Sequence, residues 1–218
     1  MKTANAKPNR CDGPAVSAVL STMTANAETE ADGGAEPAGF AQRVDAMVLA
    51  RAQRGDMHAF AAIYSVFGRA CYGLALRLTA NAAQADDLVQ EVFLKLIENI
   101  RSYRGDAPFG AWLKRMMVNA TIDLLRQRKR VAEGDPDTLF ADLENADPSP
   151  AENVDTWSLL SRLPPRARTI VVLHQLEGYT HAELATLFGQ SESYSKSILS
   201  RALQRLQTAV TPSPMVCV

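Results

Sequence analysis

The sequence predicts an all-α protein with two small helical domains, an N-terminal helical bundle and a C-terminal helix-turn-helix domain, joined by a flexible acidic linker. Three observations predict this fold. Apolar residues recur every three or four positions in two long stretches, as they do on a buried helix face, and no convincing alternating strand appears. The segment between them is aperiodic, acidic and Pro-containing, which is typical of a linker. A short capped helix, a Gly-containing turn and a second helix follow near the C-terminus.

These patterns divide the 218 residues into five parts. Residues 1–44 are rich in Ala, Thr, Asn, Gly and Glu, and they offer too little apolar surface to offset the entropy of ordering. We therefore expect a disordered N-terminal tail there. The two helical domains are expected at residues 45–130 and 157–208, the acidic linker at 131–156 and a C-terminal tail at 209–218.

The first helix of the N-terminal domain is predicted by helical spacing of apolar residues. They are Phe60, Ile63, Tyr64, Phe67, Cys71, Leu74, Ala75 and Leu78. Asn81 marks a break, and residues 86–100 are expected to form a second helix. Tyr103–Pro108 reads as a turn before a long third helix at residues 109–130.

The second helix has an apolar stripe and an acidic outer face. The stripe is expected to consist of Leu88, Val89, Val92, Phe93, Leu96 and Ile97, and the outer face carries Asp86, Asp87, Gln90, Glu91 and Leu94. An outward Leu within an acidic face fits a protein-docking surface, although one exposed Leu is also normal on any surface. Two adjacent Asp residues without a third ligand of fitting spacing do not make a metal site, so we expect no metal and no cofactor.

The third helix carries a basic stripe. Arg115, Asn119 and Arg126 lie at offsets of four and seven, and Arg128, Lys129 and Arg130 extend the charge. Eight basic and two acidic residues lie within 101–130, whereas 131–161 holds eight acidic residues and no Lys or Arg. Such clustering favours a nucleic-acid interface over the alternative, a merely solvated helix face.

The C-terminal domain contains the helix-turn-helix pattern. Thr180 and Glu183 match a capping box, Gly189 fits the left-handed residue after a short helix, and Ser191 or Ser193 can cap the next helix. On that last helix Ile198, Leu199, Ala202, Leu203 and Leu206 share one face. The opposite face carries Ser193, Ser197, Ser200, Arg201 and Gln204, flanked by Lys196 and Arg205. These polar groups suit base edges and phosphates, but an ordinary amphipathic surface helix has the same pattern.

Four ordered segments carry a family resemblance. They are GDMHAFAAIY, LALRLTANAAQADDLVQEVFLKL, YRGDAPFGAWLKRMMVNATIDLLRQRKR and LPPRARTIVVLHQLEGYTHAELATLFGQSESYSKSILSRALQRL. Together they resemble an extracytoplasmic-function (ECF) sigma factor of bacterial RNA polymerase, of the sigma-70 family. The resemblance covers about residues 46–130 and 157–207, which is essentially both predicted domains.

The resemblance implies a function and partners. The expected function is to bind core RNA polymerase and direct it to promoters, in the cytoplasm, without enzymatic activity. The acidic face with Asp86, Asp87, Gln90, Glu91 and Leu94 would dock on the clamp helices of the beta-prime subunit, and the C-terminal domain would lie near the beta flap. The segment of residues 103–130 would open and read the −10 element, with Trp112 and Asn119 matching the family's Trp and Asn, although helical periodicity also places Trp112 in the core. The last helix would read the −35 element. An anti-sigma factor is a further expected partner, and no direct membrane insertion is expected.

One short run departs from the family pattern. Where the family commonly has Gly-Thr-Val-Lys/Arg-Ser-Arg at the start of the recognition helix, this chain has Ser193-Tyr194-Ser195-Lys196-Ser197-Ile198. The family pattern therefore does not predict the promoter preference of this chain, and we expect one phosphate contact fewer.

Two other classes of protein fit less of the sequence. A helix-turn-helix regulator that binds duplex DNA by itself would explain the last helix but not the acidic or the Trp-containing helix. An enzyme would need a nucleophile–base pair, a metal cluster or a phosphate loop, and the three His residues are scattered. The three Cys residues, few and far apart, fit a reducing cytoplasm.

Overall fold

The computed structural model describes residues 38–131 and 156–210, and the structural statements below concern these two ranges. They fall into two compact units on either side of Gly134, and each unit is considered by itself. Every regular element within the described ranges is helical, which confirms the all-α prediction. Nearly all of the predicted linker, residues 1–37 of the predicted tail and residues 211–218 lie outside the described residues.

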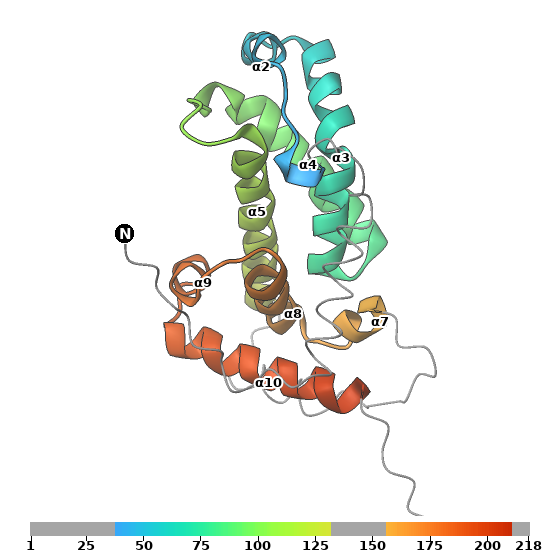
Figure 1. Cartoon of the computed structure of the whole chain (residues 1–218), viewed down its shortest axis with the longest axis vertical. Coiled ribbons are helices and arrows are strands. Elements are labelled where there is room, and N and C mark those ends of the chain that lie inside the picture. The colour runs from blue at the N-terminus through green and yellow to red at the C-terminus, as the bar shows by residue number, and fades with distance from the viewer. Residues whose placement is uncertain (1–37, 132–155, 211–218) are drawn as a thin grey trace, which may run out of the picture. The chain divides into compact units, whose positions relative to one another are not determined.

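The N-terminal unit is a helical bundle, with labels as in Figure 1. Its elements are η1 (Gly39–Ala41), α2 (Ala46–Gln53), α3 (Met57–Thr79), α4 (Ala82–Asn99), η2 (Ile100–Ser102) and α5 (Phe109–Val131). Helix α3 is central, because it contacts α2, α4, α5 and η1. The bundle's core is built from fully buried apolar side chains. They include Ile63, Phe67, Leu74, Leu96, Leu113 and Met117.

Short polar side chains define where the first helices begin. The Asp45 carboxylate accepts a hydrogen bond from the Met47 N–H (2.6 Å) at the start of α2, and Asp56 accepts one from the His58 N–H (2.9 Å) at the start of α3. Asp56 also accepts a hydrogen bond from Arg51 Nε at 2.7 Å, and this contact is the main cause that lowers the pKa of its carboxyl.

Helix α4 begins four residues earlier than the sequence pattern predicted. The chain turns at Ala80, whose φ is +49°, and the Asn81 side chain accepts a hydrogen bond from the Gln84 N–H at 3.0 Å. Asn81 is therefore both the predicted break and the N-cap of the next helix. The extra turn, residues 82–85, has little apolar character apart from Ala, which is why periodicity alone missed it.

Helix α3 is long and apolar enough to cross a membrane by length and composition alone. Its apolar stripe is instead the centre of the bundle, since Ile63, Phe67, Cys71 and Leu74 are completely buried against the neighbouring helices. The core helix of a bundle passes the same composition test.

The short 3₁₀ helix η1 belongs to the part of the chain that the sequence assigned to the tail. Its Phe40 ring stacks on Phe67 of α3 with 6.4 Å between centroids, and η1 contacts both α3 and α5. Gly110 at the start of α5 makes room for this contact, because a Cβ there would overlap the carbonyl oxygen of Phe40. Residues 39–41 are thus packed onto the bundle.

The C-terminal unit is a smaller group of helices. It contains α7 (Thr156–Ser161), α8 (Pro165–Val171), the π-helix η3 (Val172–Leu176), α9 (His181–Phe188) and α10 (Glu192–Val210). Helix α10 packs on α8 and α9. The five residues predicted to face inward, Ile198, Leu199, Ala202, Leu203 and Leu206, are all buried, so the predicted inner face of α10 is confirmed.

A buried Arg holds the turn between α7 and α8. The Arg168 side chain, 6% exposed, donates hydrogen bonds to the carbonyl oxygens of Leu160 (2.8 Å), Ser161 (3.2 Å) and Leu163 (2.8 Å). These carbonyls lie at and just after the end of α7, and that of Leu160 also accepts a hydrogen bond from the Leu163 N–H at 3.1 Å. Arg168 therefore adds side-chain donors to a helix end that has few backbone donors of its own.

The predicted helix-turn-helix signals are present as side-chain contacts. Thr180 and Glu183 form a complete capping box at the start of α9, and Gly189 ends that helix with φ +62°. Of the two candidate caps for α10, Ser191 is the one that acts, because its Oγ accepts a hydrogen bond from the Tyr194 N–H at 3.2 Å.

Candidate functional site

The predicted docking face on α4 is accessible. Asp86, Asp87, Gln90, Glu91 and Leu94 are all exposed, and Leu94 keeps 56% of its surface in contact with solvent. Glu91 forms an ion pair with Lys95, one helical turn later, at 2.6 Å. The acidic character of the face is therefore carried mainly by Asp86 and Asp87.

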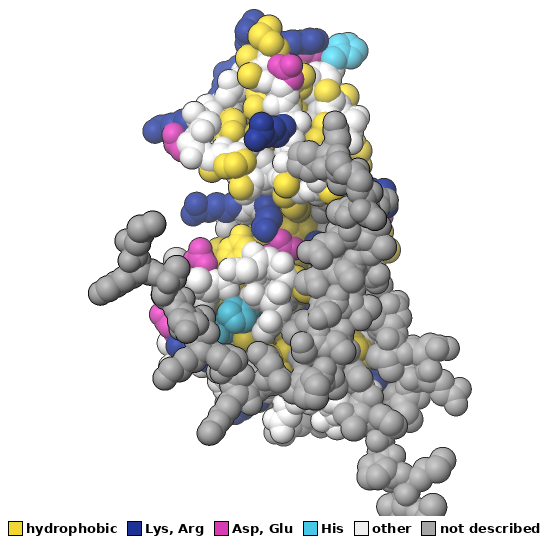
Figure 2. Space-filling model, in the orientation of Figure 1, with side chains coloured by type: hydrophobic (Ala, Val, Ile, Leu, Met, Phe, Trp, Pro, Cys, Tyr) yellow, Lys and Arg dark blue, Asp and Glu magenta, His cyan; other side chains and the backbone are white. Residues whose placement is uncertain are grey.

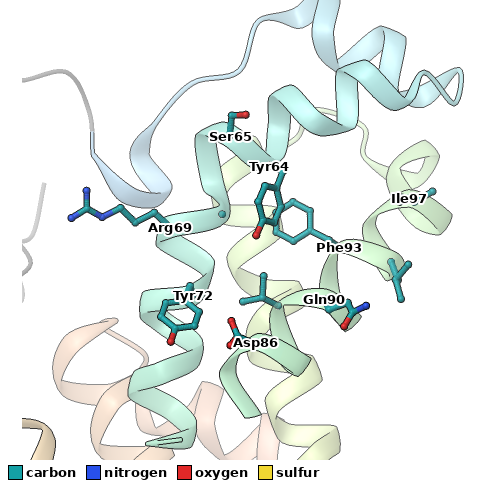
Figure 3. A pocket seen from close by; sticks show the side chains of 11 residues that line it. Tyr64, Ser65, Arg69, Tyr72, Asp86, Gln90, Phe93 and Ile97 are labelled. Carbon is teal, nitrogen blue, oxygen red and sulfur yellow. The ribbon is translucent and has the colours of Figure 1, made fainter. Parts of the chain in front are cut away.

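A groove between α3 and α4 adjoins this face. Its volume is about 670 Å³, and three of the predicted docking residues, Asp86, Gln90 and Leu94, line it. Figure 3 shows Tyr64 from α3 beside Phe93 from α4 in the middle of the groove, with Tyr72 and Asp86 toward one end and Ile97 toward the other. The two central rings meet edge to face, with 4.8 Å between their centroids. The groove thus has an aromatic floor and a mixed rim.

Two residues that follow the helical spacing of apolar positions contribute to this surface instead. Ile97, expected in the buried stripe of its helix, is 39% exposed, so that prediction was wrong, and Tyr64, which follows the helical spacing of α3, is 54% exposed. Gly68, one turn after Tyr64, allows the phenol ring to lie flat along α3, since a Cβ there would approach the ring to 3.3 Å. An aromatic followed four residues later by Gly was the sequence signal for this arrangement.

The outer face of α5 presents the predicted basic stripe. Arg115, Asn119 and Arg126 are exposed, and Arg126 lies 3.5 Å from the Asp123 carboxylate in an i,i+3 pair. The side chains of Arg128, Lys129 and Arg130 lie outside the described part of the structure, although the backbone of α5 continues to Val131. Figure 2 shows Lys and Arg side chains at several places on the visible face of the N-terminal unit, with apolar side chains exposed among them.

Trp112 lies at the edge of an aromatic cluster, neither free nor fully enclosed. It is half-buried, and its ring is tilted against Tyr103 (5.4 Å between centroids) and Phe109 (5.7 Å). The Tyr103 hydroxyl donates to the Ala107 carbonyl oxygen at 2.7 Å, which fixes the turn before α5. The cluster holds one side of the indole and leaves part of it accessible on the same helix as Asn119.

The outer face of α10 is polar and largely solvent-facing. Ser193, Lys196, Ser200, Arg201 and Gln204 are exposed, whereas Ser197 and Arg205 are half-buried. The Lys196 ammonium lies 3.2 Å from the Glu192 carboxylate, in an i,i+4 ion pair. A phosphate approaching Lys196 would therefore compete with Glu192.

The unusual run at the start of α10 makes contacts of its own. The Tyr194 hydroxyl lies 3.4 Å from Arg166 of α8, whose guanidinium also lies over the Phe188 ring. Ser195 is only 1% exposed, and its Oγ donates to the Glu192 carbonyl oxygen (3.0 Å) and lies 2.8 Å from His181 Nδ1. Ile198 is 1% exposed, so an apolar residue there is explained by packing.

Two imidazoles meet beside this run. The rings of His174 in η3 and His181 in α9 stack with 4.3 Å between centroids and 28° between planes. His174 Nδ1 lies 2.6 Å from the Tyr179 carbonyl oxygen. The sequence pattern gave no sign of this contact, because His174 and His181 are seven positions apart and His174 lies within a π-helix that periodicity does not predict.

Among the described residues, no group of three or more His, Cys, Asp and Glu side chains is arranged to hold a metal ion. Cys71 is buried in the bundle, and burial raises the pKa of its thiol to about 12. A thiol in that state is a core side chain rather than a nucleophile.

Comparison with known proteins places these surfaces in context. The family model described as Sigma-70 region 2 matches residues 63–131, and the model described as Sigma-70, region 4 matches residues 154–206. The ECF RNA polymerase sigma factor SigM of Mycobacterium tuberculosis (strain H37Rv) is 32% identical over 171 residues, covering 76% of this chain and 84% of that protein. SigM of Bacillus subtilis (strain 168), also an ECF RNA polymerase sigma factor, is 32% identical over 149 residues, covering 66% of this chain and 91% of that protein.

Among solved structures, one match is the co-crystal structure of the sigma factor RpoE in complex with the anti-sigma factor NepR from Bartonella quintana. It has a TM-score of 0.44 and 27% sequence identity, and the match covers 65% of this chain and 89% of that chain.

Proposed function

The chain belongs to the ECF sigma factors of the sigma-70 family, and from this premise we propose that it has three exposed helix faces with one role each: polymerase docking, −10 recognition and −35 recognition. The protein directs core RNA polymerase to promoter DNA through sigma regions 2 and 4, and it acts in the cytoplasm. It is a transcription factor rather than an enzyme, so bond chemistry is left to the polymerase.

The face on α4 is the proposed polymerase-docking surface. It combines exposed carboxylates at Asp86 and Asp87 with an exposed Leu94 beside the aromatic groove. Charge at the rim speeds association and orients the partner, whereas apolar surface at the centre provides most of the binding free energy. A basic, amphipathic helical surface is the partner that this combination fits, which agrees with the expected beta-prime clamp helices.

The face on α5 is the proposed −10 surface. Arg115 and Arg126 are spaced to follow a phosphate backbone, and Asn119 lies between them with both a donor and an acceptor for a base edge. Capturing an unstacked base favours the melted strand, since only the open state makes that contact. The accessible part of Trp112 offers a surface for stacking at the same face.

The face on α10 is the proposed −35 surface, and the observation that carries it is the segregation of that helix. Five apolar residues are buried on one side while Lys196, Ser200, Arg201 and Gln204 are exposed on the other. A recognition helix needs this arrangement, with its inner face fixed by the helix-turn-helix and its outer face free for the major groove. The expected contact near the beta flap and the expected anti-sigma factor stay predictions.

Replacing Asp87 by Lys tests the docking assignment. Asp87 is exposed on α4, so the fold should be retained while affinity for core polymerase falls by about 1 kcal/mol or more, in the range measured for charge changes at protein interfaces. The measurement is equilibrium binding of the full chain to core polymerase, with helix content checked by circular dichroism.

The matched control is Asp106→Lys. Asp106 is also exposed in the N-terminal unit, but it lies in the turn before α5, away from the docking face. Asp106→Lys therefore changes the net charge by the same amount as Asp87→Lys. Equal losses for both variants would show a general charge effect and would contradict the docking role of α4.

In vitro transcription with core polymerase, with and without the chain, tests the whole assignment. Specific start sites should appear only when the chain is present. Tight and specific binding of promoter duplex by the chain alone would instead favour the free-standing helix-turn-helix regulator.

A further inference from the structure

The start of α10 is fixed by an unusual polar contact. Ser195 lies in the first turn of α10, where the family pattern commonly has Val, and its side chain is almost completely buried. A buried hydroxyl without a hydrogen-bond partner destabilises the fold. Here the partners are the Glu192 carbonyl oxygen (3.0 Å) and His181 Nδ1 (2.8 Å). His181 is the first residue of α9, so this contact ties the beginning of α9 to the beginning of α10.

The directions of these hydrogen bonds set the proton positions. The single Ser195 proton is donated to the Glu192 carbonyl, so His181 Nδ1 carries the hydrogen that is donated to Ser195 Oγ. His174 Nδ1 must likewise carry a hydrogen, because its partner is the Tyr179 carbonyl oxygen at 2.6 Å. In the neutral pair both Nε2 atoms are therefore unprotonated, and any further proton adds there.

We propose that His181 is a positioning residue for α10: its Nδ1–H holds Ser195, and a charge gained at Nε2 displaces the ring from its place against His174 and so shifts the start of the helix. The proposal rests on the proposed function of α10 as the −35 reader. It assigns to this chain a pH dependence of −35 binding that the family pattern, with Val at the position of Ser195, does not provide.

The charges around His181 disfavour its protonated form. The stacked ring of His174 lies on η3. Lys196 on α10 adds positive charge near His181, and Glu192 on the same helix has the opposite effect on the His181 pKa. Glu183 of α9 is engaged in the capping box with Thr180. The N-terminus of α9 is itself the positive end of a helix dipole. Burial is the largest cause, followed by His174 and Lys196, and together they lower the pKa of His181 below its usual 6.5.

The sign of the pH effect follows from that direction. Since the pKa is lower in the folded state than in the unfolded state, the unfolded chain binds more protons near and below pH 6.5. The stabilisation is present above pH 6.5 and is lost as the pH falls through the lowered value. The coulombic effect of His174, whose ring centroid lies 4.3 Å away, also disfavours a charged His181 ring, so the stacked arrangement is weakened when His181 gains its proton.

The first experiment is an NMR titration of the full chain with isotopically labelled His. His58, exposed on α3 in the N-terminal unit, serves as an internal reference. We expect the His181 ring to titrate below 6.5 and the backbone amides of Ser195 and Lys196 to shift with the same midpoint. His174→Gln removes one cause of the lowered His181 pKa, so the His181 midpoint should rise. An unchanged midpoint in that variant, or Ser195 and Lys196 amides that do not follow the titration, would overturn the proposal.

The second experiment measures binding of holoenzyme to promoter DNA between pH 7.5 and 5.5. Affinity for a −35-containing fragment should fall as the pH falls through this range, because His181 gains its proton there. His181→Asn keeps a donor at the position of Nδ1 for Ser195 but cannot titrate in this range, so it should bind normally at pH 7.5 and lose most of the pH dependence. His58→Gln should behave like the parent. Retention of the full pH dependence by His181→Asn would contradict the proposal.

The variant Arg201→Ala distinguishes a failure of α10 as the −35 reader from a failure of His181 as a positioning residue. If this variant discriminates −35 sequences as the parent does, the assignment of α10 as reader fails, while the NMR titration still decides whether His181 positions the helix. If Arg201→Ala loses discrimination but the Ser195 amide does not shift as His181 titrates, the assignment of α10 as reader stands and the positioning role of His181 fails.

Discussion

At the scale of single residues, the contact between Phe40 and Gly110 shows how a segment of low apolar content is held on the bundle. Phe40 is the one aromatic residue within the first 44 positions, and its ring reaches Phe67 in the core. The backbone of Phe40 lies so close to α5 that only Gly fits at position 110. A Gly near the start of a helix is otherwise unfavourable compared with Ala. Its presence is explained by the approach of η1.

Gly110→Ala should therefore destabilise the N-terminal unit by about 1–3 kcal/mol, the usual cost of overpacking a closely packed site. The atom that would be overlapped is a backbone carbonyl oxygen, which cannot rotate away as a flexible side chain can. Urea unfolding followed by Trp112 fluorescence measures the change. Trp157→Phe in both proteins removes the other of the two Trp residues from the signal.

Removal of residues 1–41 provides the control for this prediction. Without Phe40 the space beside Gly110 is open, so the same substitution should become neutral or stabilise α5 by up to about 1 kcal/mol through helix propensity. A substitution that destabilises both backgrounds equally would mean that the overlap with Phe40 is not the cause.

At the scale of helices, sequence periodicity predicted the inner face of α10 correctly and those of α3 and α4 less well. The apolar face of α10 is buried as predicted, because one helix packed against two neighbours follows the 3.6-residue period closely. Tyr64 and Ile97 satisfied the same period on α3 and α4 but are exposed. They line the groove between α3 and α4, and no pattern within one helix specifies how the next helix packs against it.

The polar contacts at the start of α10 were beyond sequence reasoning for a similar reason. His174, His181 and Ser195 lie on three different elements, and their meeting depends on the π-helical turn of η3. By contrast, caps depend on residues three positions apart, so Thr180, Glu183 and Ser191 were predictable. The predicted roles of the exposed residues in binding polymerase and DNA are untested by geometry and stay predictions.

Two exposed residues of α10 are expected to play different roles in DNA binding, and experiments can distinguish these roles. Arg201 is exposed on the outer face, so Arg201→Ala should cost about 1–3 kcal/mol on the preferred −35 sequence and reduce discrimination among −35 sequences. Lys196 is expected to contact a phosphate, so Lys196→Ala should weaken all sequences equally and reduce the salt dependence. Binding of holoenzyme to a panel of −35 variants at several salt concentrations separates these outcomes.

A third variant checks the ion pair that Lys196 forms. Glu192→Gln removes the carboxylate 3.2 Å from the Lys196 ammonium and should strengthen binding to all −35 sequences alike. Loss of sequence discrimination in Lys196→Ala, or retained discrimination in Arg201→Ala, would reverse the roles assigned to these two residues.

At the scale of the whole molecule, the protein consists of two compact units joined through residues 132–155. Each unit presents a face that suits nucleic acid, and each face is small, with a few exposed basic or polar side chains. Small faces bind weakly by themselves. A covalent connection makes the second contact intramolecular and replaces bulk concentration by an effective concentration set by the connecting segment. The connection is therefore expected to be part of promoter selectivity.

Cleavage of that connection in the folded protein tests this argument. A protease site inserted between Glu144 and Asn145 leaves both units intact, and cutting after purification avoids any question of folding. Transcription from a promoter with separate −10 and −35 elements should fall by about 10²-fold or more at low protein concentration, the lower range of measured avidity gains. The uncut protein with the same insertion should retain activity, and raising the concentration of the cut protein should restore part of it, because mass action then replaces tethering. Full activity of the cut protein at low concentration would show that polymerase docking alone aligns the two units, and that the connection contributes nothing to selectivity.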